Sequence, residues 1–110
     1  MGAPLTISFP GASSGEANRY AASLATAIRD SARGVQVEQR RDRPDTQDFG
    51  ATLAVILGTA SATAVANGVA LWLARHSGAK IQISADRTVI ASNLDSQDAA
   101  RIAEAFSGPK

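Results

Sequence analysis

The longest continuous pattern in the chain is an uncharged stretch from Phe49 to Ala74. On a helical wheel its aliphatic and aromatic side chains point in most directions, so a helix here would need to be buried on nearly all sides. A single helix of this length would extend about 39 Å, which exceeds the roughly 34 Å diameter of a domain of this size. Because Gly58 offers a natural break, we predict a buried central pair of helices, near Thr46–Leu57 and near Ser61–His76.

Small residues recur at every fourth position of the same stretch. The series is Gly50, Ala54, Gly58, Ala62, Ala66, Ala70 and Ala74. On a helix such a series forms a smooth ridge that another backbone can approach closely. Soluble cores also contain alanine ridges, so the pattern leaves open whether this ridge faces inside or outside. For the outward orientation we expect an interaction surface that includes Gly58, Ala62, Ala66, Ala70 and the nearby Trp72.

Two strands and a helix are expected before this stretch. Leu5, Ile7 and Phe9 alternate with polar residues, as in a strand with one buried face. Apolar positions then follow a helical period from a cap at Ser14 to the stop at Gly34, and a second strand begins at Val35. The order strand, helix, strand predicts that the two strands are parallel and joined by a right-handed crossover.

A hairpin and a final helix are expected after it. Ile81 and Ile83 mark a third strand, and a turn at Asp86-Arg87 returns the chain as an antiparallel strand over Thr88–Ser92. Asp95 or Ser96 caps the last helix, whose inward residues we predict to be Ala99, Ile102, Ala103 and Phe106. The predicted order is β-α-β-α-α-β-β-α over residues 1–110 as a single domain. This is an α/β (α+β) two-layer sandwich with a mixed four-stranded sheet.

The uncharged stretch is also long enough to span a membrane. Asn67 and several hydroxyl residues dilute it, and its flanks lack an aromatic belt and paired basic clusters. We therefore favour core helices and keep a membrane-inserting segment as the alternative.

Charge and cysteine content narrow the functional classes. The formal net charge is +1 and there is no cysteine, so we expect no nucleic-acid partner, no disulfide and a cytoplasmic location. The basic residues Arg40, Arg41 and Arg43 alternate with acidic residues in a segment without periodicity, Gln39–Asp48. We predict an exposed, partly self-paired loop there, which could also serve as an electrostatic docking site.

Candidate chemistry is sparse. The single histidine, His76, is expected at a helix C-terminus, where a cation complements the dipole. Ser13 and Ser14 lie in a glycine-containing turn that could hold an anion, but the sequence has no phosphate-loop or dinucleotide motif. No set of residues suggests acid–base, nucleophilic or metal chemistry. We therefore predict no catalytic residues, no cofactor and no metal, and we expect the protein not to be an enzyme.

The segment VILGTASATAVANGVALWLARHSGAKIQISADRTVIASN combines several features in order. An aliphatic run ends in Leu-Gly, a turn of small residues leads to a helix ending in Leu-Trp-Leu-Ala-Arg, and a strand pair precedes the closing helix. From Leu57 through Phe106 the chain resembles the bacterial effector-associated constant component family, and the opening strand and helix fit that family as well. The resemblance implies a small non-catalytic component of bacterial conflict (antiphage-type) systems, encoded beside caspase-like or trypsin-like peptidases.

Three functional hypotheses follow. The first is an adaptor or regulatory component that self-associates or docks an effector through the small-residue helices and the Arg40–Asp48 loop. The second is a membrane-inserting, pore-type component that uses the central apolar helices. The third is a small-ligand sensor at the Gly11–Gly15 turn.

Overall fold

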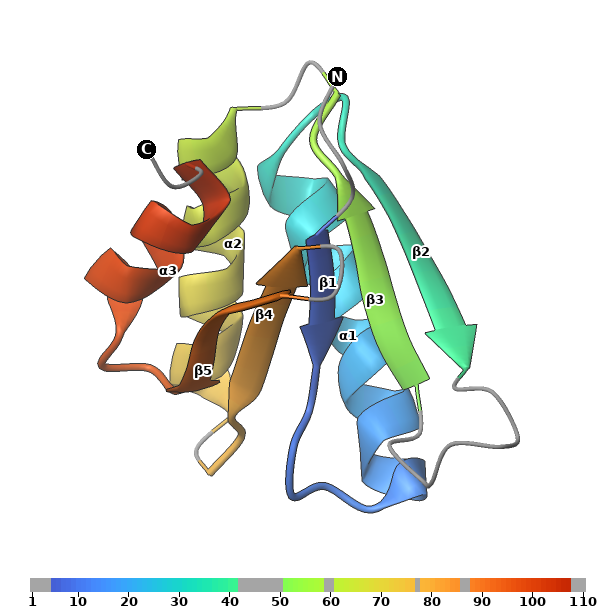
Figure 1. The fold of residues 1–110 in the computed structure, drawn as a ribbon. Coiled ribbons are helices and arrows are strands. Elements are labelled where there is room, and N and C mark those ends of the chain that lie inside the picture. Colours follow the sequence, from blue (N-terminus) through green and yellow to red (C-terminus); the bar gives the residue numbers. More distant parts are fainter. Residues whose placement is uncertain (1–4, 42–50, 59–60, 77, 86–87, 108–110) are drawn as a thin grey trace.

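The computed structural model describes residues 5–41, 51–58, 61–76, 78–85 and 88–107. Within them the chain forms five strands and three helices (Figure 1). In chain order these are β1 (Leu5–Ser8), α1 (Ser14–Ser31), β2 (Gln36–Arg41), β3 (Ala51–Ile56), α2 (Ala62–Arg75), β4 (Ile81–Ala85), β5 (Thr88–Leu94) and α3 (Ala99–Ser107). The α+β class is confirmed, whereas the four-stranded mixed sheet is wrong.

The sheet has five strands in the order β2-β3-β1-β4-β5, and every neighbouring pair is antiparallel. Strands β1 and β2 run in the same direction, as their connection through α1 predicts. They are not neighbours, however, because β3 lies between them and pairs with both. The expected parallel pair is therefore replaced by two antiparallel ladders.

The predicted helix near Thr46–Leu57 is wrong over the part that the structure describes, where β3 forms instead. Leu53, Ala54 and Val55 are all buried, because β3 lies inside the sheet with β1 on one side and β2 on the other. Thr52, Val55 and Ile56 are β-branched residues, which favour strands over helices. The central helix pair thus becomes one strand and one helix, α2.

Two further boundaries differ from the expectation. Helix α1 is capped by Ser13, not Ser14: the Ser13 hydroxyl accepts from the Glu16 N–H (3.2 Å), and the Ser13 N–H donates to the Glu16 carboxylate (3.3 Å). This is a capping box. Residues 39–41 belong to β2 and not to a loop, while residues 42–48 of the predicted loop lie outside the described residues.

The C-terminal elements agree more closely with the sequence pattern. Strands β4 and β5 form the expected antiparallel pair, with Ile81 opposite Leu94, although the residues of the predicted turn at Asp86-Arg87 lie outside the described residues. In α3, Ile102 and Phe106 are buried as predicted. Ala99 is exposed and Ala105 is buried instead, because the helix begins at Ala99 and its inward face is set by the contact with α2.

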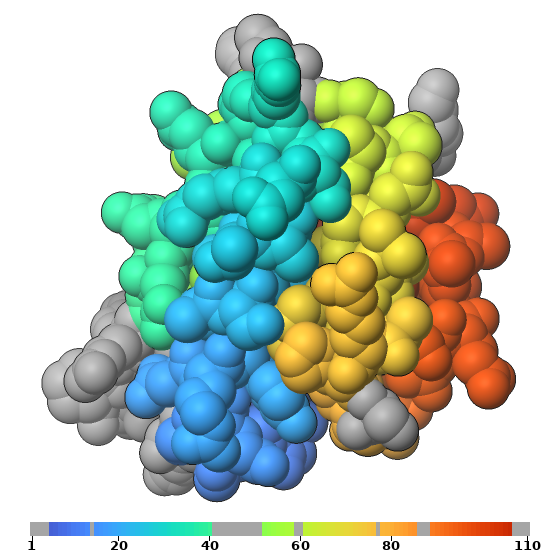
Figure 2. Space-filling model, turned by 180° about the vertical axis from the view of Figure 1, so that it is seen from behind, coloured from blue at the N-terminus to red at the C-terminus, as the bar shows by residue number. Residues whose placement is uncertain are grey.

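The helices form the second layer of the molecule. Seen from behind, α1 and α2 lie side by side over the sheet and α3 packs along the other side of α2 (Figure 2). The register aligns Ile7 with Leu53 and Ile83 across three strands, and all three are fully buried. This apolar row faces the helices and forms the centre of the core.

Candidate functional site

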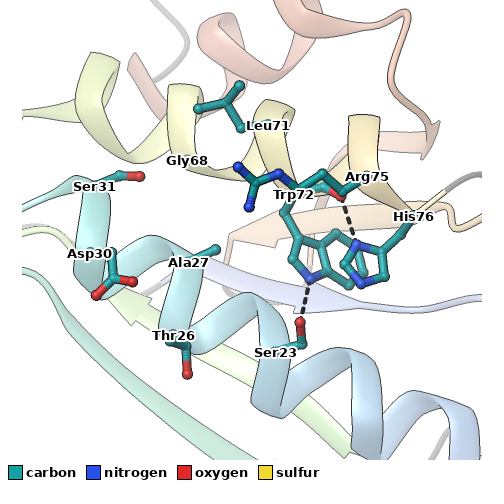
Figure 3. A pocket seen from close by; sticks show the side chains of 10 residues that line it. All are labelled: Ser23, Thr26, Ala27, Asp30, Ser31, Gly68, Leu71, Trp72, Arg75 and His76. Carbon is teal, nitrogen blue, oxygen red and sulfur yellow. Dashed lines mark hydrogen bonds between the residues drawn. The ribbon is translucent and has the colours of Figure 1, made fainter.

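A groove of about 560 Å³ lies between α1 and α2 (Figure 3). Its lining residues come from both helices and are Ser23, Thr26, Ala27, Asp30, Ser31, Gly68, Leu71, Trp72, Arg75 and His76. Five of the ten lie on α1, four lie on α2, and His76 is the C-cap of α2, so the groove exists only because the two helices pack against one another.

Gly68 brings the two helices together. A Cβ atom built at this position would lie 2.8 Å from the Ser31 hydroxyl oxygen, 2.9 Å from the Ser31 Cβ and 3.3 Å from the Ala27 carbonyl oxygen. These distances are shorter than ordinary van der Waals contact, so no larger residue fits without moving a helix. The absent side chain at Gly68 therefore sets the helix spacing beside the groove.

Trp72 forms the floor of the groove. Only 3% of it is exposed, and its indole N–H donates to the Ser23 hydroxyl on α1 at 2.9 Å. The Tyr20 ring meets it edge-on at 5.4 Å, and the Phe9 ring lies 6.2 Å away. Because such aromatic pairs add about 0.5–1.5 kcal/mol beyond area burial, this cluster holds the end of β1 and both helices in fixed positions.

His76 is the C-cap of α2 and stacks on the indole of Trp72, with 4.2 Å between ring centroids and 20° between planes. Its Nδ1 lies 2.8 Å from the Trp72 carbonyl oxygen. Since a carbonyl can only accept, Nδ1 is assigned the proton and Nε2 is the acceptor nitrogen of the neutral ring. The helix-end position predicted for His76 is confirmed.

The rim of the groove carries an exposed leucine and two opposite charges. Leu71 on α2 is 59% exposed. Asp30 on α1 and Arg75 on α2 are exposed, and neither side chain forms an ion pair or hydrogen bond within the described part of the chain. Figure 3 shows the Arg75 guanidinium group extending over the space between the two helices. The groove therefore offers an apolar side chain together with one unpaired acid and one unpaired base.

The predicted small-residue ridge does not form an exposed surface. Ala66 is buried and Ala62 and Ala70 are partly buried, and Ala54 lies in β3, so the four-residue period does not run along one helix. Correspondingly, α2 packs against α1 on one side and α3 on the other. Ala66 is part of the core, so at this position of the ridge the small side chain serves packing within the fold.

The other predicted interaction residues are scattered. Gly58 follows β3 with a φ of +56°, where a Cβ would lie 2.9 Å from the Gly34 carbonyl oxygen, so its role is a backbone turn. Arg40 is exposed on β2 and forms an ion pair with Glu38 at 2.9 Å, in keeping with the self-pairing that the charge pattern suggests. Arg41 ends β2, and Arg43 lies outside the described residues. Among the predicted interaction residues that the structure describes, Trp72 lines the groove, whereas Gly58 and Arg40 do not.

The groove residues that sequence reasoning missed are Asp30, Gly68, Leu71 and Arg75. A glycine within a helix costs about 1 kcal/mol relative to alanine, so Gly68 was a signal of close packing. Leu71, Asp30 and Arg75 gave no such signal, because only the tertiary contact of α1 with α2 places them around one groove.

A second hollow of about 310 Å³ lies at the predicted sensor turn. It is lined by Pro10, Gly11, Ala12, Glu16, Tyr20, Gly78, Ala79 and Lys80. The N–H groups of Ser13 and Glu16 are both used by the capping box. Those two amides are therefore not available to an anion, which removes part of the basis for the sensor hypothesis.

The described ranges hold neither a metal site nor a membrane-spanning helix. No group of three or more His, Asp or Glu side chains there could hold a metal ion. Among the helices the structure describes, none combines the length and the apolar character needed to cross a membrane.

Comparison of the chain with protein-family models, with curated proteins and with solved structures finds no match. The family resemblance therefore remains a prediction from the sequence, and the geometry of the groove carries the functional argument.

Proposed function

We propose that this protein is a non-catalytic adaptor or regulatory component that binds a protein partner through the groove between α1 and α2. The observation that carries the proposal is Leu71, an exposed leucine beside the unpaired Asp30 and Arg75. Burying a leucine side chain is worth about 1.5–3 kcal/mol, and charges at the rim of an interface guide association and orientation. These are the components of a small protein-binding surface.

The family resemblance suggests the biological setting. It supports a role in a bacterial conflict (antiphage-type) system, with a caspase-like or trypsin-like peptidase as the effector that the adaptor docks or regulates. From the sequence alone, the expected docking surface was the small-residue helices and the Arg40–Asp48 loop. We now propose the groove between α1 and α2 as the docking surface.

The described residues do not form the two consecutive apolar helices that motivated the membrane-inserting alternative. It depended on two consecutive apolar helices in the uncharged stretch, and the described part of that stretch is β3 followed by α2. Strand β3 is paired on both sides within the sheet, so its release would break two ladders. We therefore do not carry this alternative further.

Titration calorimetry with the peptidase encoded beside the gene tests the proposal. We expect the wild-type chain to bind the peptidase. Leu71→Asp should lower the affinity at least about tenfold, because the complex would then bury a charged carboxylate where the wild type buries a leucine. Val89→Asp is the matched control, since Val89 is 50% exposed and lies on β5, outside the groove. No binding by the wild-type chain, or equal losses in both variants, would contradict the proposal.

A further inference from the structure

We propose that the groove between α1 and α2 binds the same groove of a second copy of this chain, related to it by a two-fold axis. This inference rests on the proposed function, because it concerns the same surface: a second copy covers the groove of the free chain, and the peptidase binds there by displacing it. Three properties of the groove support a copy over other occupants: its charge, its shape and its size.

The two rim charges are self-complementary. Asp30 and Arg75 lie on different helices and border the same groove. In a two-fold interface each contact between residues i and j is repeated between j and i. A single arrangement can therefore place Asp30 of each copy against Arg75 of the other, which gives two ion pairs and leaves neither charge unpaired.

A small ligand of one charge fits this surface less well. An anion bound by Arg75 would be repelled by Asp30, and a cation bound by Asp30 would be repelled by Arg75. The occupant must carry both signs at matching positions. A second copy meets this requirement without any further assumption, since its own groove carries the same acid and the same base.

The shape of the groove is also self-complementary. Leu71 projects from the rim with 59% of its surface exposed, and the groove beside it is lined on α1 by the short side chains of Ser23, Thr26 and Ala27. The groove volume of about 560 Å³ exceeds that of a leucine side chain. When two copies meet face to face, Leu71 of each can enter the groove of the other and pack towards Trp72.

The molecule is large enough for such an interface. Its principal extents are 33 × 29 × 24 Å, and a standard interface buries about 800 Å² on each partner. Most of the face formed by α1 and α2 would then take part, with the leucine at its centre and the charges near its rim.

The β2 edge is a less suitable site for self-association. Glu38 and Arg40 already pair with each other on this strand. The Arg29 side chain donates to the Val37 carbonyl oxygen at 2.7 Å. Charged side chains and occupied carbonyls are features that discourage strand pairing between molecules.

Sedimentation velocity of the full chain over about 10 μM to 1 mM, a range suited to weak dimers, tests the inference. We expect a reversible dimer in the wild-type chain. Asp30→Arg and Arg75→Asp should each raise the dissociation constant at least about tenfold, because each places like charges opposite one another, while the double variant should recover to within about threefold of wild type. Leu71→Asp should also abolish dimerisation, and Val89→Asp should leave it unchanged.

Four results would overturn the inference. They are a wild-type chain that stays monomeric throughout, a dimer that Leu71→Asp does not weaken, a dimer that Val89→Asp does weaken, and a double charge variant that is no better than the single ones. Circular dichroism and thermal unfolding confirm that each variant is folded. A monomeric chain that still binds the peptidase through Leu71 refutes the dimer and leaves the proposed function standing. A chain that neither dimerises nor binds the peptidase refutes the dimer and the proposed function together.

Discussion

Gly68 shows how one residue controls the relation between two elements. Within a helix a glycine is disfavoured by about 1 kcal/mol relative to alanine, yet here it permits the contact of α2 with Ser31 and Ala27 on α1. The same close contact fixes Trp72 beside Ser23 and so shapes the groove. The glycine therefore lowers the intrinsic stability of α2 and at the same time permits its close packing against α1.

We predict that Gly68→Ala lowers the free energy of unfolding by about 1 kcal/mol. Overpacking against the Ser31 Cβ costs about 1–3 kcal/mol, and the gain in helix propensity offsets part of it. Chemical denaturation followed by the fluorescence of Trp72, the one tryptophan in the chain, measures the change. The control is Asn67→Ala, at an exposed neighbouring position, which should be neutral or slightly stabilising; equal effects of the two substitutions would contradict the packing argument.

At the scale of elements, the turn before α3 is stabilised by hydrogen bonds between short side chains and the backbone. The Asp95 N–H donates to the Asp98 carboxylate at 2.9 Å, and the Gln97 N–H donates to the Asp95 carboxylate at 2.9 Å. The hydrogen bond from the Asp95 backbone lowers the pKa of Asp98 below its ordinary value of 3.8, and Arg101 nearby acts in the same direction. The ionised form of Asp98 is therefore the one that the folded state favours.

We predict a pH-dependent contribution of Asp98 to stability. Because its pKa is lowered in the folded state, the contribution is present above pH 3.8 and is lost as the pH falls through the folded-state pKa. Asp98→Ala should therefore lower the melting temperature at pH 7. Its effect should be smaller at pH values below the folded-state pKa of Asp98, where the wild-type carboxyl group is also uncharged. Thermal unfolding of both proteins across the acid range tests this, and a constant difference between them would refute it.

At the scale of the whole molecule, β3 connects the edge strand β2 to the central strand β1. Strand β1 in turn pairs with β4, which continues the sheet into β5. Its buried side chains also contact α1. The residues of β3, which were expected to belong to the first of two central helices, are thus part of the sheet against which the helices pack.

We predict that Leu53→Ala and Ile56→Ala differ strongly in effect. Leu53 is fully buried and Ile56 is 37% exposed, so the first should cost about 2–5 kcal/mol and the second about 1 kcal/mol or less. In a helix these positions, three residues apart, would share one face and respond alike. Equal losses in urea denaturation would therefore favour a helix over the strand.

Local patterns were sufficient for the elements whose signals lie within a few residues. The alternation of Leu5 and Ile7, the helical period of α1, the β4–β5 pair and the break after Gly58 each identified an element or a boundary. Caps, turns and side-chain periods act between neighbours in the chain, so they can be recognised without knowing the rest of the fold.

The tertiary structure decided what those patterns could not. A run such as Leu53–Ile56 is too short for its period to distinguish a strand from a buried helix, and it became a strand because β1 and β2 supply ladders on both sides. The groove has the same origin. Asp30 and Arg75 are 45 positions apart in the sequence, and only the contact of α1 with α2 at Gly68 places them on one surface. The chain by itself determined the local elements, and long-range packing determined the sheet order and the candidate site.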